Sequence, residues 1–386
     1  MQKRIYFDNQ ATTPVDARVL EAMLPFFGAK FGNAASRTHS FGWEAEKAVE
    51  TARRRIAELA GAAPREIIFT SGATESDNLA IKGVMEASRA KGRHLITMST
   101  EHRAVLDAAR HLEKQGCHLT LLPPDADGLL DPARLRDAIR SDTVLVSVMY
   151  ANNEIGVLQP IREIGAICRE RGVFFHCDAA QAFGKIPVQV EEDRIDLMSL
   201  SAHKMYGPKG VGALYVRRRS PRVTMAAQMD GGGHESGFRS GTLNVPGIVG
   251  FGEACAIARR EMAEESQRTT AFRDRLIAQL ESALDGAVLN GSRTARLPGN
   301  VNMSFAGVEA DTLLLSLSDI ALSTGSACSS ASPEPSHVLK ALKTGPWRER
   351  SAIRFGIGRF NTAEEIDYVA GRVVESVRKL RSLMPA

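Results

Sequence analysis

Residues 173–181 have the sequence Val-Phe-Phe-His-Cys-Asp-Ala-Ala-Gln, an apolar run typical of a buried strand that ends in a carboxylate. Similar short β-rich runs recur between residues 64 and 216, and segments with helical spacing separate most of the early ones. Such alternation predicts βαβ units on a mainly parallel sheet. Ligands of such sheets bind beyond the carboxyl ends of the strands. The other expected strands are 66–70, 94–98, 143–149, 195–200 and 212–216.

The regions on either side of this sheet are predicted to be helical before it and mixed α+β after it. Apolar positions recur with the 3.6-residue period of a helix between about 41 and 59. The expected division is a large domain of residues 16–258 and a small domain of residues 1–15 and 259–386. The elements expected in the second half are a charged helix at about 261–284, a strand at 300–305 and a helix at about 363–380.

Composition indicates an ordinary globular chain. Of 386 residues, 44% are hydrophobic and 24% charged, and the net charge of +4 is spread over the whole length, which does not favour nucleic-acid binding. The five cysteines form no C-x-x-C pair, so we expect free thiols in a reducing compartment and no metal site. No stretch is long and apolar enough to predict a membrane span or a signal peptide, and the expected location is the cytoplasm.

A turn that opens a helix follows the strand at 66–70, with the sequence Thr-Ser-Gly-Ala-Thr-Glu-Ser-Asp-Asn over residues 70–78. Backbone N–H groups at a helix N-terminus favour an anion, and Thr74 adds a hydroxyl donor. The segment lacks the P-loop pattern, so a nucleotide triphosphatase is not indicated. A simple helix cap remains the alternative interpretation of this segment alone.

Two strands end in residues that together fit pyridoxal phosphate (PLP). Asp178 follows the strand predicted at 172–177, and Lys204 follows the strand at 195–200 in Ser-Ala-His-Lys. A lysine in a semi-buried site can form a Schiff base with an aldehyde, and a carboxylate can hold a pyridine nitrogen protonated. A surface lysine paired with a local acid is the plainer reading of Lys204 by itself. The occurrence of the turn at 70–78, Asp178 and Lys204 in this order along the chain favours a PLP site.

Further polar residues follow other strands at the same sheet edge. His102, after the strand at 94–98, could stack on a pyridine ring and exchange protons near neutral pH, or be a loop residue. Asn153 and Gln181 could bond a ring hydroxyl, or be turn residues.

Cys328 lies in a segment of small and turn-forming residues, at about 323–336. Such a loop is expected to be mobile and exposed, which suits a thiolate nucleophile that must move. An incidental surface thiol is the alternative. The other four cysteines fall in or beside predicted strands and helices, where thiols behave as small apolar groups.

Taken together, these motifs resemble the cysteine desulfurases of the class V aminotransferase group. The resemblance covers nearly the whole chain in order, and the long Cys328 segment is similar to the housekeeping and nitrogen-fixation branch (group I). The matching segments are 8–14, 70–78, 201–210, 239–243, 325–329 and 351–355.

That resemblance implies the PLP-dependent transferase fold of type I, with a mainly parallel seven-stranded sheet in the large domain and a smaller α+β domain. Lys204 would bind the PLP aldehyde, Asp178 the pyridine nitrogen and Gln181 the ring oxygen. His102 and Asn153 would lie beside the cofactor. The implied phosphate ligands are Ala73, Thr74, Ser201 and His203.

It also implies roles toward the substrate and the partner subunit. Arg354 would bind the substrate carboxylate, with Asn153 and Asn33 beside it, and Thr242 would reach the phosphate bound by the partner of a homodimer. Cys328 would carry the persulfide.

The implied reaction is removal of sulfur from L-cysteine. Lys204 and His102 would move protons, and the Cys328 thiolate would take the sulfur, leaving L-alanine. An iron–sulfur scaffold protein or another acceptor, such as one for tRNA thiolation, would receive the persulfide. The alternatives are a selenocysteine lyase or other PLP-dependent β-elimination enzyme, and a non-catalytic assembly platform.

Overall fold

The computed structural model of the chain describes residues 4–324 and 336–383. Its largest sheet has seven strands: β2 (Ile67–Thr70), β3 (His94–Met98), β4 (His118–Leu122), β5 (Thr143–Ser147), β6 (Phe174–Asp178), β7 (Leu197–Ser201) and β8 (Gly212–Val216). They lie in the order β2-β8-β7-β6-β5-β3-β4. All neighbours from β7 to β4 pair parallel, and β8 pairs antiparallel with β7 and β2. The expected α/β class with a mainly parallel seven-stranded sheet is confirmed.

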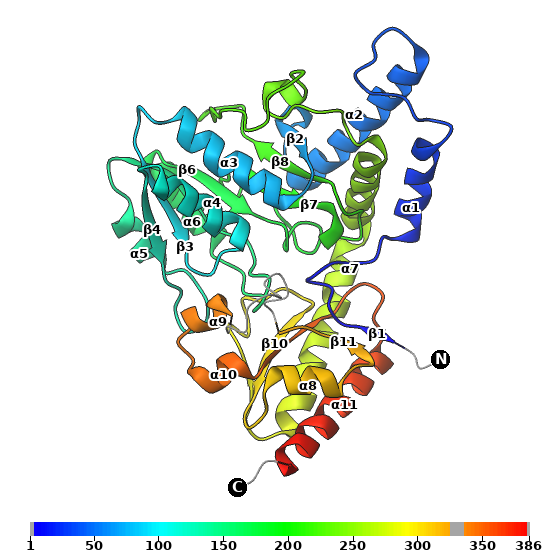
Figure 1. Cartoon of the computed structure of the whole chain (residues 1–386), viewed down its shortest axis with the longest axis vertical. Helices are drawn as coiled ribbons and strands as arrows, with labels where there is room; N and C mark the ends of the chain where they lie inside the picture. The colour runs from blue at the N-terminus through cyan, green and yellow to red at the C-terminus, as the bar shows by residue number, and fades with distance from the viewer. Residues whose placement is uncertain (1–3, 325–335, 384–386) are drawn as a thin grey trace.

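Helices cover both faces of this sheet (Figure 1). On one face α3 (Ala73–Ala87) and α4 (Arg103–Lys114) pack their apolar sides on the strands. On the other face α2 (Ser40–Ala60), α6 (Ile161–Arg171) and the first part of α7 (Val245–Ala283) form a second core with the opposite side of the same strands. Shorter helices in this part are α1 (Ala17–Met23), η1 (Leu24–Phe27), η2 (Pro64–Glu66), α5 (Pro132–Ala138), η3 (Ala202–Lys204) and η4 (Glu235–Gly237).

A smaller part of the molecule lies below this sheet in Figure 1 and has its own core. It contains an antiparallel sheet in the order β12-β10-β9 and a parallel pair of β1 and β11. The strands are β1 (Ile5–Tyr6), β9 (Ala287–Leu289), β10 (Asn300–Phe305), β11 (Ile320–Ala321) and β12 (Ala352–Gly356). The helices are α8 (Ala310–Ser316), α9 (His337–Ala341), α10 (Pro346–Arg350) and α11 (Ala363–Ser382).

The long helix α7 belongs to both parts. Its buried residues up to Ala258 pack in the core of the large sheet, whereas those from Leu276 onward pack in the smaller core. Ile5 and Phe7 also belong to the smaller core, and Val19 to the larger one. We therefore propose the division into residues 16–258 and residues 1–15 with 259–386.

Two of the differences from the sequence prediction have a clear physical reason. The edge strand β4 was not among the predicted runs, because its exposed and half-buried residues lack a clear apolar pattern. Helix α7 begins at Val245 rather than near 261. Its first turns contain glycines that lower helix propensity, but Gly252 lies so close to Ala52 of α2 that a Cβ there would be 2.5 Å from the Ala52 Cα. Close packing of the two helices thus outweighs propensity.

None of the helices formed by residues 4–324 and 336–383 contains a segment long and apolar enough to cross a membrane.

Candidate active site

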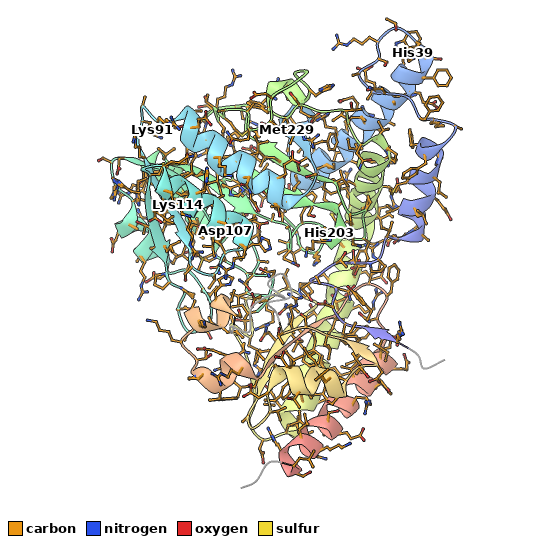
Figure 2. The ribbon with its side chains drawn as sticks, viewed as in Figure 1. His39, Lys91, Asp107, Lys114, His203 and Met229 are labelled. Carbon is orange, nitrogen blue, oxygen red and sulfur yellow. The ribbon has the colours of Figure 1, made fainter. Side chains whose placement is uncertain are left out.

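A cavity of about 520 Å³ opens at the carboxyl ends of the parallel strands, a size typical of small-molecule sites. Residues from the N-terminal segment, from the strand ends of the large sheet and from β12 line it. Figure 2 shows His203, one of the lining residues, between the part that holds the large sheet and the smaller part. The predicted residues that line it are Ala73, Thr74, His102, Asn153, Asp178, Gln181, Ser201, His203, Lys204 and Arg354.

One wall of the cavity is the N-terminus of α3. The helix begins at Ala73 after Gly72, whose φ of 156° lies in a region that favours glycine, and no side chain caps it. A Cβ on Gly72 would meet no atom within 4 Å, so the turn faces open space. The alternative of a simple side-chain cap is wrong for this helix. Its first N–H groups have no acceptor within the helix and suit an anion.

Lys204 is held by the N-terminal segment. Its Nζ donates to the backbone oxygens of Gln10, at 2.6 Å, and Ala11, at 2.8 Å. Thr13 fixes the same turn, because its N–H and its hydroxyl both donate to the His203 carbonyl. The two carbonyl oxygens fix the position of the partly buried Lys204 amine at the cavity.

Asp178 lies buried at the end of β6, where its Oδ1 accepts the N–H of Ala180 at 2.9 Å. Burial raises the pKa of its carboxyl, while the charges of His102 and Lys204 act in the opposite direction. Two further buried carboxyls stand nearby, Asp77 and Glu101, and burial raises their pKa values well above the ordinary range. A cationic group placed at Asp178 would favour its ionised form.

The two histidines of the cavity are positioned differently. His102 caps α4, and its Nδ1 accepts the Ala104 N–H at 3.2 Å, so the proton of its neutral ring lies on Nε2. His203 Nδ1 lies 3.1 Å from the Thr12 hydroxyl oxygen. Burial and the charges of Lys204 and other nearby lysines lower the pKa of His203 to about 4. His203 is therefore neutral near pH 7.

The smaller part contributes Arg354 from β12, which is buried. Its guanidinium donates to the Asn153 carbonyl at 2.9 Å and to Asp8 Oδ1 at 2.8 Å. These contacts hold the guanidinium between the N-terminal segment and the loop after β5, at the wall of the cavity. The planar group can bind a second carboxylate with two hydrogen bonds.

The segment with Cys328 lies outside the described residues, but the residues on either side of it contact this site. Before it, Ser323 accepts the Arg354 N–H at 2.7 Å through its backbone oxygen. After it, the Ser336 hydroxyl donates to the buried carboxylate of Glu154, which is the neighbour of Asn153. Ser323 and Ser336, which flank residues 325–335 in the sequence, thus contact residues of the site.

Two other predicted residues lie apart from the cavity within this one chain. Asn33 is exposed, and its side-chain oxygen accepts the Ala35 N–H at 2.9 Å. Thr242 is exposed just before α7. Conversely, Gln10 and Ala11 hold Lys204 although only their motif, and no role for them, appeared in the sequence analysis.

The cavity residues fit PLP on the evidence of the fold itself. The cavity has a helix N-terminus at Gly72 whose N–H groups suit an anion, a positioned amine at Lys204 and a buried carboxyl at Asp178 that suits a cationic partner. A phosphorylated aldehyde with a ring nitrogen offers a partner for each of the three.

Comparisons with known proteins agree with this chemistry. The sequence model of the family described as "Aminotransferase class-V" matches residues 5–369. A protein from Anaeromyxobacter sp. (strain Fw109-5) named "Cysteine desulfurase IscS" is 60% identical over 385 residues, which span 100% of this chain and 95% of that protein.

Solved structures give the same result. A structure described as "NIFS-LIKE PROTEIN" superposes with a TM-score of 0.91 at 39% identity, over 97% of this chain and 100% of the other. A structure described as "SspA in complex with cysteine" superposes with a TM-score of 0.81 at 38% identity, over 93% and 100% of the two chains.

Proposed function

We infer the roles of the cavity residues from the premise that this chain belongs to the class V aminotransferase family and is a PLP-dependent cysteine desulfurase acting on L-cysteine. When bound, PLP supplies an aldehyde for amines and a ring that accepts electrons. We propose that Lys204 carries it and that Asp178 pairs with its ring nitrogen. The observation that carries this proposal is the convergence of both residues with the α3 N-terminus on one cavity.

At the phosphate end, the N–H groups that open α3 and the hydroxyl of Thr74 serve as donors. Ser201 and neutral His203 lie on the same cavity and add two more polar groups. A neutral imidazole can donate one hydrogen bond to an anion without adding a full charge.

At the substrate end, Arg354 binds the carboxylate of L-cysteine, and the side-chain amide of Asn153 lies beside the substrate. Asp8 and the Asn153 carbonyl hold the guanidinium in place before substrate arrives, which reduces the entropy lost on binding. The same residue lies against Ser323, so substrate binding takes place where the Cys328 segment begins.

Proton movement falls to Lys204 and His102, which both line the cavity. Cys328, as thiolate, attacks the substrate sulfur. An S–S bond forms and the C–S bond breaks, and its electron pair stays with the substrate carbon, which takes up a proton to become L-alanine. The sulfur remains on Cys328 as a persulfide.

The alternative of a selenocysteine lyase or another β-elimination enzyme is not favoured, because relatives 54–60% identical over nearly the whole chain are named cysteine desulfurases. A non-catalytic platform is disfavoured for the same reason.

The direct test is to supply the purified protein with L-cysteine and a thiol reductant. We expect alanine and sulfide in equal amounts. Arg354→Lys should raise KM for L-cysteine about 30-fold with a smaller change in kcat, since loss of one charge-assisted hydrogen bond costs about 2 kcal/mol. Arg275→Lys, at an exposed ion pair with Asp367, is the matched control. An unchanged KM for Arg354→Lys would remove Arg354 from the substrate site.

We propose that the active form is a homodimer in which Thr242 reaches the partner's phosphate site. Thr242 is exposed in the single chain, and large apolar side chains at Phe27, Phe31, Phe41 and Trp43 are half or more exposed, with the rings of Phe31 and Phe41 5.5 Å apart. Light scattering should give twice the chain mass of 41.8 kDa, and Phe31→Glu should lower that mass and the activity together. A fully active monomer would contradict the shared site.

The sulfur acceptor is proposed to be an iron–sulfur scaffold protein or another acceptor with a thiol. A reducing compartment such as the cytoplasm suits this transfer, and the four described cysteines are free.

A further inference from the structure

Lys185 is a partly buried lysine beside the active site that the proposed reaction does not use. It lies in the short turn after Gln181, and its Nζ donates to Gln181 Oε1 at 3.2 Å. Within residues 4–324 and 336–383, no carboxylate lies within ion-pair distance of it. Lys185 also does not line the 520 Å³ cavity, whereas Gln181 does. Its contact with the cavity is therefore made through Gln181.

The neighbours of Gln181 fix which end of its amide faces which way. The charged form of Lys185 can only donate, so it requires the amide oxygen of Gln181 on its side. On the other side, Gln181 Nε2 donates to the Gln10 carbonyl at 3.0 Å, which can only accept. Reversal of the amide would break both contacts at once. The second N–H of Gln181 has no acceptor among the described residues and is left for a group inside the cavity.

The Gln10 carbonyl joins this arrangement to Lys204, because it also accepts from Lys204 Nζ at 2.6 Å. Lys185 and Lys204 are thus linked through Gln181 and Gln10. The charged groups facing Lys185 are Lys204, Arg354 and Glu265, from three different elements. Burial and then the charge of Lys204 lower the pKa of Lys185 to about 7. Charged forms of the two lysines therefore disfavour each other.

We propose that Lys185 is a positioning residue that holds the Gln181 amide with its N–H toward the cofactor ring oxygen and places a second positive charge behind Lys204. This inference rests on the proposed PLP site. The hydrogen bond from Gln181 and the charge of Lys185 both lower the pKa of the Lys204 nitrogen that carries the cofactor. A donor to the ring oxygen stabilises its anionic form, and a nearby cation opposes a proton on the nitrogen.

The test is a pH titration of the visible absorption band of the cofactor-loaded protein. Lys185→Met keeps the length of the side chain but removes its charge and donor. We expect the pH midpoint of the band to rise by on the order of one unit. Lys185→Arg keeps charge and donor, and should stay within a few tenths of a unit of wild type. Exposed Lys47→Met is the control for loss of a distant positive charge, and the melting temperature of each variant reports folding.

A double-mutant cycle separates positioning from simple charge. Gln181→Leu should raise the same midpoint, and the double variant with Lys185→Met should rise by no more than the larger single change, because the two residues act as one unit. A double variant whose shift equals the sum of the single shifts would overturn the positioning role. An unchanged midpoint in Lys185→Met would overturn the proposal entirely.

The experiment distinguishes failure of the proposed PLP site from failure of the inference about Lys185. If wild-type protein shows no visible band with PLP, the assignment of Lys204 fails before Lys185 is tested. If wild type shows the band and titrates, and Lys185→Met and Lys185→Arg behave alike, only the inference about Lys185 fails.

Discussion

Lys204→Ala should lower alanine formation from L-cysteine by about 1,000-fold or more. The amine at this position both carries the cofactor and moves the substrate proton in the proposed mechanism, and loss of a single general acid–base group typically costs 10²–10⁴-fold. The carbonyl oxygens of Gln10 and Ala11 that hold the amine remain in the variant without their donor. Activity is measured as alanine released, and the visible band should change because the linkage to Lys204 is lost.

The matched control is Lys82→Ala, which removes a partly buried lysine of α3 that does not line the cavity. It should keep wild-type activity and spectrum. If a Lys204→Ala variant with a normal melting temperature retains a tenth of the activity, then another group carries the cofactor and moves the substrate proton. A partial rescue of Lys204→Ala by an added small primary amine would support the role of the Lys204 amine itself.

Cys328→Ala should lower alanine formation by a similar factor while leaving the cofactor band intact. Without the thiolate, the substrate sulfur has no acceptor and the C–S bond is not broken by this route. The two variants therefore differ in their spectra, although both lose activity. Binding of L-cysteine to Cys328→Ala should still alter the band, because Arg354, Lys204 and Asp178 are unchanged.

Cys117→Ala is the control for Cys328→Ala, since Cys117 is a partly buried thiol whose pKa is raised by burial. It should release alanine at the wild-type rate. If Cys328→Ala also does so, the sulfur leaves without a protein persulfide and a lyase reaction becomes the better description.

Much of the large domain could be predicted from local pattern. The runs around residues 94–98, 143–147 and 212–216 are apolar and β-rich because they are buried on both faces, and they became β3, β5 and β8. The start of α7 could not be predicted, because its glycines are explained by contact with α2, which is distant in sequence. Edge strand β4 lacked a pattern because it is half exposed.

Within the site, His102, Asp178 and Lys204 could be named from sequence because they follow strands that share one sheet edge. Arg354, in β12 of the other sheet, was named only through the family resemblance. The residues that position these side chains could not be named from the sequence. Gln10 and Ala11 act through backbone oxygens, which carry no side-chain signature, and Lys185 acts through an amide whose orientation depends on two neighbours far apart in sequence. The proposed role of Thr242 depends on a second subunit. In the single chain, the structure shows only that Thr242 is exposed.

The central claim is that the sulfur of L-cysteine passes to Cys328. The most direct measurement reacts the purified protein with one equivalent of L-cysteine without reductant, traps thiols by alkylation, and determines the masses of its peptides. The account predicts one extra sulfur atom on the peptide that contains Cys328, in an amount equal to the alanine formed, and none on the Cys117 peptide. Alanine formed in full while the Cys328 peptide stays unmodified and the sulfur appears as free sulfide would contradict it.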